Sequence, residues 1–83
     1  MRVFASEMRV FPNPSSGQIQ VGGAIEPGAL LRVISPMGKI LLQRRIQPDE
    51  IQVPLDLSNL ATGLYSIEMI GENGITTKKV VLE

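Results

Sequence analysis

Glycine and proline interrupt this chain at short intervals, and their spacing limits the chain to short extended segments. The 8 glycines and 6 prolines are spread along the 83 residues instead of being gathered in one linker. Each interruption ends a segment before it is long enough to form a stable helix. The segments between them are rich in β-branched residues, which favour strands. The sequence therefore predicts an all-β domain with almost no helix.

Within these segments, apolar and polar residues alternate with a period of two, which places the apolar residues on one buried face. The dipeptide Asn73-Gly74 is typical of a two-residue hairpin turn between the last two strands. Seven strands with short turns predict a seven-stranded antiparallel immunoglobulin-like Greek-key β-sandwich. The predicted strands cover residues 8–11, 18–21, 31–34, 39–46, 51–57, 65–69 and 75–82.

The fourth and fifth predicted strands carry residues that disturb the alternation. In the fourth strand, the buried face is expected to hold Ile40, Leu42 and Ile46. Arg44 falls on the same face and therefore marks either a bulge or the exposed end of the strand. In the fifth strand, Pro54 cannot donate a backbone hydrogen bond to a neighbour, so we expect this strand at the edge of a sheet.

The charge balance and the missing residue types argue against several classes of function. Lysine and arginine total 8, aspartate and glutamate total 8, and the chain has no histidine and no cysteine. A neutral chain lacks the basic surface that nucleic acids require. Without histidine and cysteine, it also lacks the usual metal ligands, the thiol nucleophile and the base that titrates near neutral pH. No aliphatic run is long enough to span a bilayer. We expect no cofactor, no metal, no nucleic acid partner, no direct membrane span and no enzyme activity.

Two small groups of residues could still be interpreted as chemical sites. A serine nucleophile would need a lysine base, and Ser35 and Lys39 are the nearest such pair in the sequence. They flank a tight turn, where a lysine is not buried enough for its pKa to fall. Asp49 and Glu50 follow a proline in another turn, where capping and solvation explain both carboxylates. Too few oxygens accompany them for a calcium site.

The first eleven residues contain a short repeat, because Met-Arg-Val-Phe occurs at residues 1–4 and again at residues 8–11. Coincidence between two β-prone stretches is one interpretation. The alternative is that both copies can occupy one position in a sheet, which would give a monomer with an ambiguous register or a strand-exchanged dimer. We expect residues 1–7 to be an N-terminal extension or the remnant of an upstream linker.

Residues 60–65 are typical of a chain that crosses between the two sheets of a Greek-key sandwich. In that corner, the hydroxyl of Tyr65 is expected to return to an upstream backbone group. Gly63 is expected to let the chain approach its neighbours closely. Both roles are structural.

Three separated segments resemble one family, the C-terminal sorting domains of the bacterial type IX secretion system. Residues 10–21 are similar to its opening "YPNP…G…" segment, with Phe11 in place of the commoner tyrosine. Residues 33–41 resemble its middle hairpin, with Ser35 where an aspartate is common. Residues 60–65 and 77–82 resemble its closing "L…GxY…K…" segment. The residues that carry the resemblance, each for recognition or for structure, are Pro12, Asn13, Pro14, Gly17, Gly38, Lys39, Gly63, Tyr65, Lys78, Lys79 and Val80.

The resemblance implies that residues 8–83 are a non-catalytic sorting signal, which directs a cargo protein across the outer membrane through the type IX secretion system. It implies three partners: a cargo domain fused upstream, the type IX translocon, and a sortase-like signal peptidase that usually removes the signal. The protein would pass through the periplasm and reach the cell surface or the extracellular space. The alternative is an immunoglobulin-like adhesion or carbohydrate-binding module of an extracellular enzyme, which the shortage of aromatic residues disfavours.

The last strand is the expected recognition element, because Lys78 and Lys79 lie beside the apolar residues 80–82. The alternative is that these lysines protect an exposed edge against aggregation. The loop at residues 12–14 is either a second recognition element or a rigid connection into the fold, and we favour rigidity. Lys79, which directly precedes Val80, fits the family lysine better than Lys78.

Overall fold

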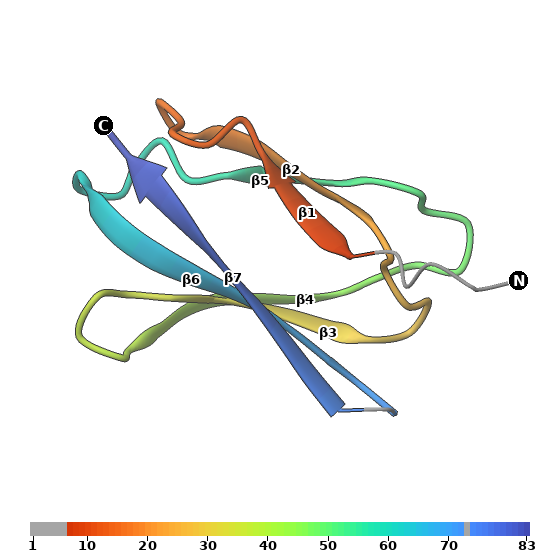
Figure 1. The fold of residues 1–83 in the computed structure, drawn as a ribbon. Helices are drawn as coiled ribbons and strands as arrows, with labels where there is room; N and C mark the ends of the chain where they lie inside the picture. Colours follow the sequence, from red (N-terminus) through yellow and green to blue (C-terminus); the bar gives the residue numbers. More distant parts are fainter. Residues whose placement is uncertain (1–6, 73) are drawn as a thin grey trace, which may run out of the picture.

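A computed structural model describes residues 7–72 and 74–83, and these residues form two antiparallel sheets packed face to face (Figure 1). One sheet has the strand order β1-β2-β5, and the other has the order β4-β3-β6-β7. No helix occurs in the described residues, which confirms the predicted all-β class. The first copy of the repeat and Asn73 lie outside the described residues. The strands are β1 (Met8–Phe11), β2 (Gln18–Gly23), β3 (Leu30–Ile34), β4 (Ile40–Arg45), β5 (Val53–Asp56), β6 (Gly63–Gly71) and β7 (Gly74–Leu82).

The core lies between the two sheets and is built by the residues that the period-two alternation points inward. Each buried aliphatic side chain of this kind stabilises the fold by roughly 1.5–3 kcal/mol relative to an exposed one. Burial of both inner faces therefore holds the sheets together. The buried cluster consists of Met8, Ile19, Val21, Ala29, Leu31, Val33, Ile46, Val53, Leu55, Leu57, Tyr65, Ile67, Met69, Val80 and Leu82.

Strand β5 confirms the prediction made from Pro54, because among the described residues it pairs only with β2 and forms an edge of its sheet. The predicted start of this strand at Ile51 is wrong. Ile51 is 83% exposed, and pairing with β2 begins only at Val53. The turn before the strand has not yet brought residue 51 alongside β2, so its apolar side chain faces solvent although it continues the alternation.

Strand β4 corrects the prediction for its buried face. Ile40 pairs with Ile34 and Leu42 pairs with Val33, so Leu41 is an extra residue in a β-bulge. The bulge shifts the alternation, and Ile40 is exposed instead of buried. The bulge, which Arg44 suggested for the end of this strand, therefore lies at Leu41, near the start of β4.

Strands β6 and β7 form the predicted hairpin, and β7 begins one residue earlier than expected. Gly71 pairs with Gly74, so Gly74 already belongs to the ladder. The predicted role of Asn73 lies outside the described residues. The hairpin is long, and β7 forms the outer edge of the four-stranded sheet.

Candidate functional site

The three segments that carry the sequence signatures lie together at one end of the sandwich (Figure 1). Ser15, after β1, bridges to Leu82 at the end of β7, and Leu82 also pairs with Gly63 at the start of β6. The ring of Pro36, in the turn between β3 and β4, lies 3.5 Å from the position of a Cβ on Gly63. We call this region the signature end, and it comprises residues 12–17, 35–39, 60–65 and 79–83.

Asn13 connects the loop after β1 to the backbone of β7. Its amide group donates to the carbonyl oxygen of Lys79 at 3.1 Å, and its Oδ1 accepts from the backbone N–H of Val81 at 3.0 Å. The Asn13 side chain thus supplies one donor and one acceptor to the edge of β7, as the backbone of a neighbouring strand would. The peptide bonds Phe11-Pro12 and Asn13-Pro14 in this loop are both cis.

Ser15 extends this pairing to the end of the chain, although it was not among the predicted site residues. Its backbone N–H donates to the carbonyl of Val81 at 2.8 Å, and its carbonyl accepts from the N–H of Glu83 at 2.9 Å. Its buried hydroxyl donates to the Gln18 carbonyl and accepts from the Gly17 N–H, both at 3.0 Å. A serine two residues before a glycine could have suggested this local turn.

Gly17 lies where the loop passes close to the crossing between β5 and β6. Its φ is +134°, and a Cβ placed on it would approach the Cα of Ser58 to 2.7 Å. Its carbonyl accepts from the N–H of Leu57 at 2.7 Å. Both the backbone conformation and the lack of space therefore require glycine at this position.

The turn between β3 and β4 is closed by the hydroxyl of Ser35. Ser35 Oγ accepts from the N–H of Met37 at 3.2 Å and from that of Lys39 at 3.0 Å. The Gly38 N–H donates to the Ser35 carbonyl at 2.9 Å. Serine thus supplies an oxygen acceptor at the position where the resemblance leads us to expect aspartate. The hydroxyl is engaged by backbone amides, and Lys39 is exposed, so the pair is not arranged as a nucleophile and its base.

Tyr65 forms the contact expected of a corner tyrosine, because its hydroxyl donates to the carbonyl of Ala61 at 2.6 Å. The ring is buried in the core. The close approach expected at Gly63 is not found, because a Cβ there would meet its neighbours at ordinary van der Waals distances of 3.5 Å or more. The reason for glycine is its φ of +155°, which other residues rarely adopt.

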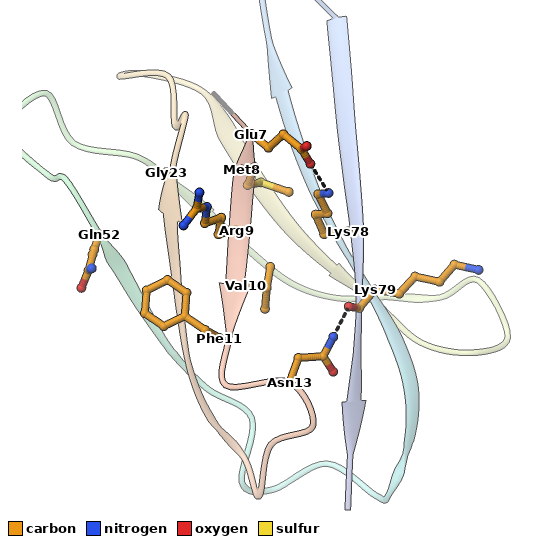
Figure 2. Close-up of a pocket in the computed structure, with 10 residues that line it drawn as sticks. All are labelled: Glu7, Met8, Arg9, Val10, Phe11, Asn13, Gly23, Gln52, Lys78 and Lys79. Carbon is orange, nitrogen blue, oxygen red and sulfur yellow. Dashed lines mark hydrogen bonds and ion pairs between the residues drawn. The ribbon is translucent and has the colours of Figure 1, made fainter. Parts of the chain in front are cut away.

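The three residues singled out on β7 have different environments. Val80 is fully buried in the core. Lys78 points toward the first sheet and forms an ion pair with Glu7 at 2.6 Å. Lys79 is exposed, and its side chain points away from the groove beside it (Figure 2). Alternation along the strand therefore separates the two adjacent lysines onto opposite faces.

A groove of about 940 Å³ lies between β1 and β7, the two strands that border the open side of the sandwich (Figure 2). Val10 contributes apolar surface beside the buried Met8, and Asn13 lies at one end. The hydrogen bond from the Lys78 ammonium, together with its charge, holds the pKa of Glu7 below its ordinary value. These side chains offer charge and hydrogen bonds but no nucleophile poised beside a base.

The turn with the paired carboxylates is explained by an ion pair. The backbone N–H of Gln47 donates to Glu50 at 2.8 Å, and Arg44 binds the same carboxylate at 2.9 Å. The Gln47 N–H contributes most to lowering the pKa of Glu50, and Arg44 adds to it. Arg44, whose position interrupts the apolar alternation of the fourth predicted strand, is thus engaged in this ion pair. Within the described part of the chain, no three acidic side chains gather closely enough to hold a metal ion.

No helix formed by residues 7–72 or 74–83 is long and apolar enough to cross a membrane. A search of curated proteins gave no match to this chain. A family model described as the secretion system C-terminal sorting domain matches residues 9–83, which is nearly the whole sequence. The match includes all the segments that meet at the signature end. The chain therefore belongs to the family of secretion system C-terminal sorting domains.

Proposed function

We propose that this domain is read as a folded, non-catalytic unit that delivers a cargo protein fused upstream to the type IX translocon. Its family function is that of a C-terminal signal for type IX secretion. The absence of histidine and cysteine from the sequence supports a role without catalysis.

The proposal includes the later fate of the protein. The domain passes through the periplasm with its cargo, and a sortase-like peptidase then removes it. The cargo reaches the cell surface or the extracellular space. Residues 8–83 form the sorting domain, and residues 1–7 are an extension or the remnant of a linker to the cargo. Membership of a family of secretion sorting domains supports this route.

We assign the fold to the immunoglobulin-like Greek-key sandwiches. The strand order β1-β2-β5 facing β4-β3-β6-β7 supports this assignment. In constant-type immunoglobulin domains the fourth strand joins the sheet of the first, second and fifth. Here β4 pairs with β3 instead, so the domain would be a variant in which one edge strand has changed sheets.

The observation that carries the proposal is the pairing of the 12–16 loop with the last residues of β7. Asn13 and Ser15 together bind the four backbone groups that point away from β6 at the free edge of β7 between residues 79 and 83. These groups are the Lys79 carbonyl, the Val81 N–H, the Val81 carbonyl and the Glu83 N–H. This half of the strand edge is already covered, which weakens the alternative that Lys79 is needed to protect it from aggregation. We propose that the loop holds the end of β7 in place and that the exposed side chain of Lys79 is available for recognition.

The buried position of Val80 and the local contacts of Gly17, Gly38, Gly63 and Tyr65 support structural roles for these residues. Pro12 and Pro14 would make the loop rigid, and Lys78 would fix β7 to the residue before β1. Deleting residues 78–83 would remove two core side chains and unfold the domain. A test of recognition must therefore change exposed residues while the core remains intact.

The experiment places this domain behind a reporter that carries a signal peptide, in a bacterium with the type IX apparatus. We expect the reporter to be exported, and we expect it to stay in the periplasm when Val80→Asp unfolds the domain. Export of the Val80→Asp fusion at the wild-type level would contradict the proposal that the translocon recognises the folded domain. Retention of the wild-type fusion in the periplasm, in cells that export their own cargo, would contradict the proposed function itself.

A further inference from the structure

The outer face of the four-stranded sheet carries a group of exposed apolar side chains at the signature end. We call this group the outer patch and define it as Ile34, Ile40, Leu41, Leu64 and Val81. Ile40, Leu41, Leu64 and Val81 are 45%, 37%, 46% and 39% exposed, and Ile34 is partly exposed. Met37, at the tip of the adjoining turn, is 95% exposed. A contiguous exposed apolar surface on a small soluble domain marks an interaction site.

The strand register makes these side chains neighbours. Leu64 pairs with Val81, and Ile34 pairs with Ser66, two residues further along β6. Ile34 therefore lies diagonally beside Leu64 on the same face. On its other side Ile34 pairs with Ile40, and the bulge adds Leu41 next to it. The bulge thus enlarges the patch, because it turns Ile40 from the core to the solvent.

Lysines lie at both edges of the patch. Lys79 lies two residues before Val81 on the same face of the edge strand β7, opposite Ser66. Lys39 is exposed in the turn that precedes Ile40 of β4, the opposite edge strand. Lys79 is therefore placed to meet the rim of a partner that covers the apolar side chains. Glu83 lies two residues beyond Val81 along the same edge.

All parts of the patch belong to the segments that resemble the sorting-domain family: residues 33–41, residues 60–65 and residues 77–82. What unites the family is delivery to one export apparatus. On the basis of the proposed function, we propose that the outer patch docks a protein of that apparatus through an apolar surface bordered by a carboxylate that pairs with Lys79. The apolar centre supplies affinity, and the charged border fixes orientation.

The same face provides a matched control. Ile75 is 63% exposed on the outer face of β7, and it lies at the other end of the strand, beside Ile70. Between Ile75 and the outer patch, the face is polar, with Arg32 opposite Glu68 and Glu68 opposite Thr77. Ile75→Gln therefore removes a more exposed apolar side chain from β7 without touching the patch. Arg9→Glu, at an exposed position of β1, is the matching charge control.

The test compares export of the reporter fusion carrying Leu64→Gln or Lys79→Glu with export of the two controls. Truncating a central interface residue weakens binding about tenfold or more. We expect both patch variants to lower the exported fraction about tenfold, with the reporter retained in the periplasm. Both controls should stay within about twofold of wild type. Urea denaturation of each purified variant verifies that the domain remains folded.

A photocrosslinking residue at position 64, but not at position 75, should join the fusion to a protein other than a second copy of itself. Equal export of Leu64→Gln and Ile75→Gln, with both domains folded, would overturn the inference while leaving the proposed function standing. Sedimentation that shows a dimer dissociated by Leu64→Gln would assign the patch to a second copy instead. Binding of the purified domain to phosphatidylglycerol vesicles, lost in the same variant, would assign it to a membrane. A wild-type fusion that is not exported would overturn the proposed function and this inference with it.

Discussion

Replacing Asn13 with alanine tests whether one side chain in the 12–16 loop secures the end of β7. The substitution removes the hydrogen bonds to the Lys79 carbonyl and the Val81 N–H, at 3.1 and 3.0 Å. Each such bond contributes a net stability of about 0.5–1.5 kcal/mol. Both bonds are exposed, so water replaces them in part. We therefore expect Asn13→Ala to lower the free energy of unfolding by about 1–2 kcal/mol.

A loss of this size is a large part of the stability of a domain of this length, which is roughly 4–12 kcal/mol. It corresponds to a fall in the melting temperature of about 4–8 °C for each kcal/mol. Urea denaturation gives the free energy, and amide hydrogen exchange gives its location. Exchange at the Val81 N–H should become faster, because its acceptor is lost.

Asn59→Ala is the matched control, because Asn59 is an exposed loop asparagine. Its substitution should change the stability by less than about 0.5 kcal/mol. Asn13→Asp is a second variant that keeps the acceptor for Val81 and loses the donor to Lys79, so it should recover part of the loss. The reasoning would be refuted if Asn13→Ala were no less stable than Asn59→Ala and exchange at Val81 were unchanged.

Three further predictions concern packing and charge, two at the signature end and one in the turn between β4 and β5. Tyr65→Phe removes the 2.6 Å hydrogen bond in the corner, and it should cost about 1–1.5 kcal/mol in urea denaturation; an unchanged stability would show that the hydroxyl contributes nothing net. Gly17→Ala forces a Cβ to within 2.7 Å of the Cα of Ser58, and we expect a loss of about 1–3 kcal/mol or more, measured in the same way. Glu50 has a pKa below 4.5 in the folded protein, chiefly because the Gln47 N–H binds it, so its stabilising effect is present above that pH and is lost as the pH falls through the lowered pKa. Glu50→Gln should therefore flatten the loss of stability on acidification that wild type shows below about pH 4.5, and identical acid profiles for the two proteins would contradict this assignment.

The class of fold follows from local information. Alternation such as that of Tyr65, Ile67 and Met69 specifies which side chains are buried, because successive strand residues point to opposite faces. Pro54 identified an edge strand, because it lacks the N–H that a central strand must donate. These properties belong to single residues and their immediate neighbours. They do not depend on which strands meet.

The departures from local expectation depend on pairing between strands. Ile40 and Ile51 both continue an apolar alternation and are both exposed, because a bulge shifts one and the other lies before its strand reaches a partner. The hydrogen bonds of Asn13 could not be inferred from its neighbours, since its partners are 66 and 68 residues away.

The sequence by itself determined that this protein is all-β, which face of most strands is buried, and to which family its three separated segments point. Only the tertiary structure decided that those segments meet at one end, that Asn13 and Ser15 cover the terminal edge, and that a bulge exposes an apolar patch beside Lys79. The reason is that alternation and turn residues act through short-range sterics. Register, edge pairing and the meeting of distant segments are set by contacts across the whole chain.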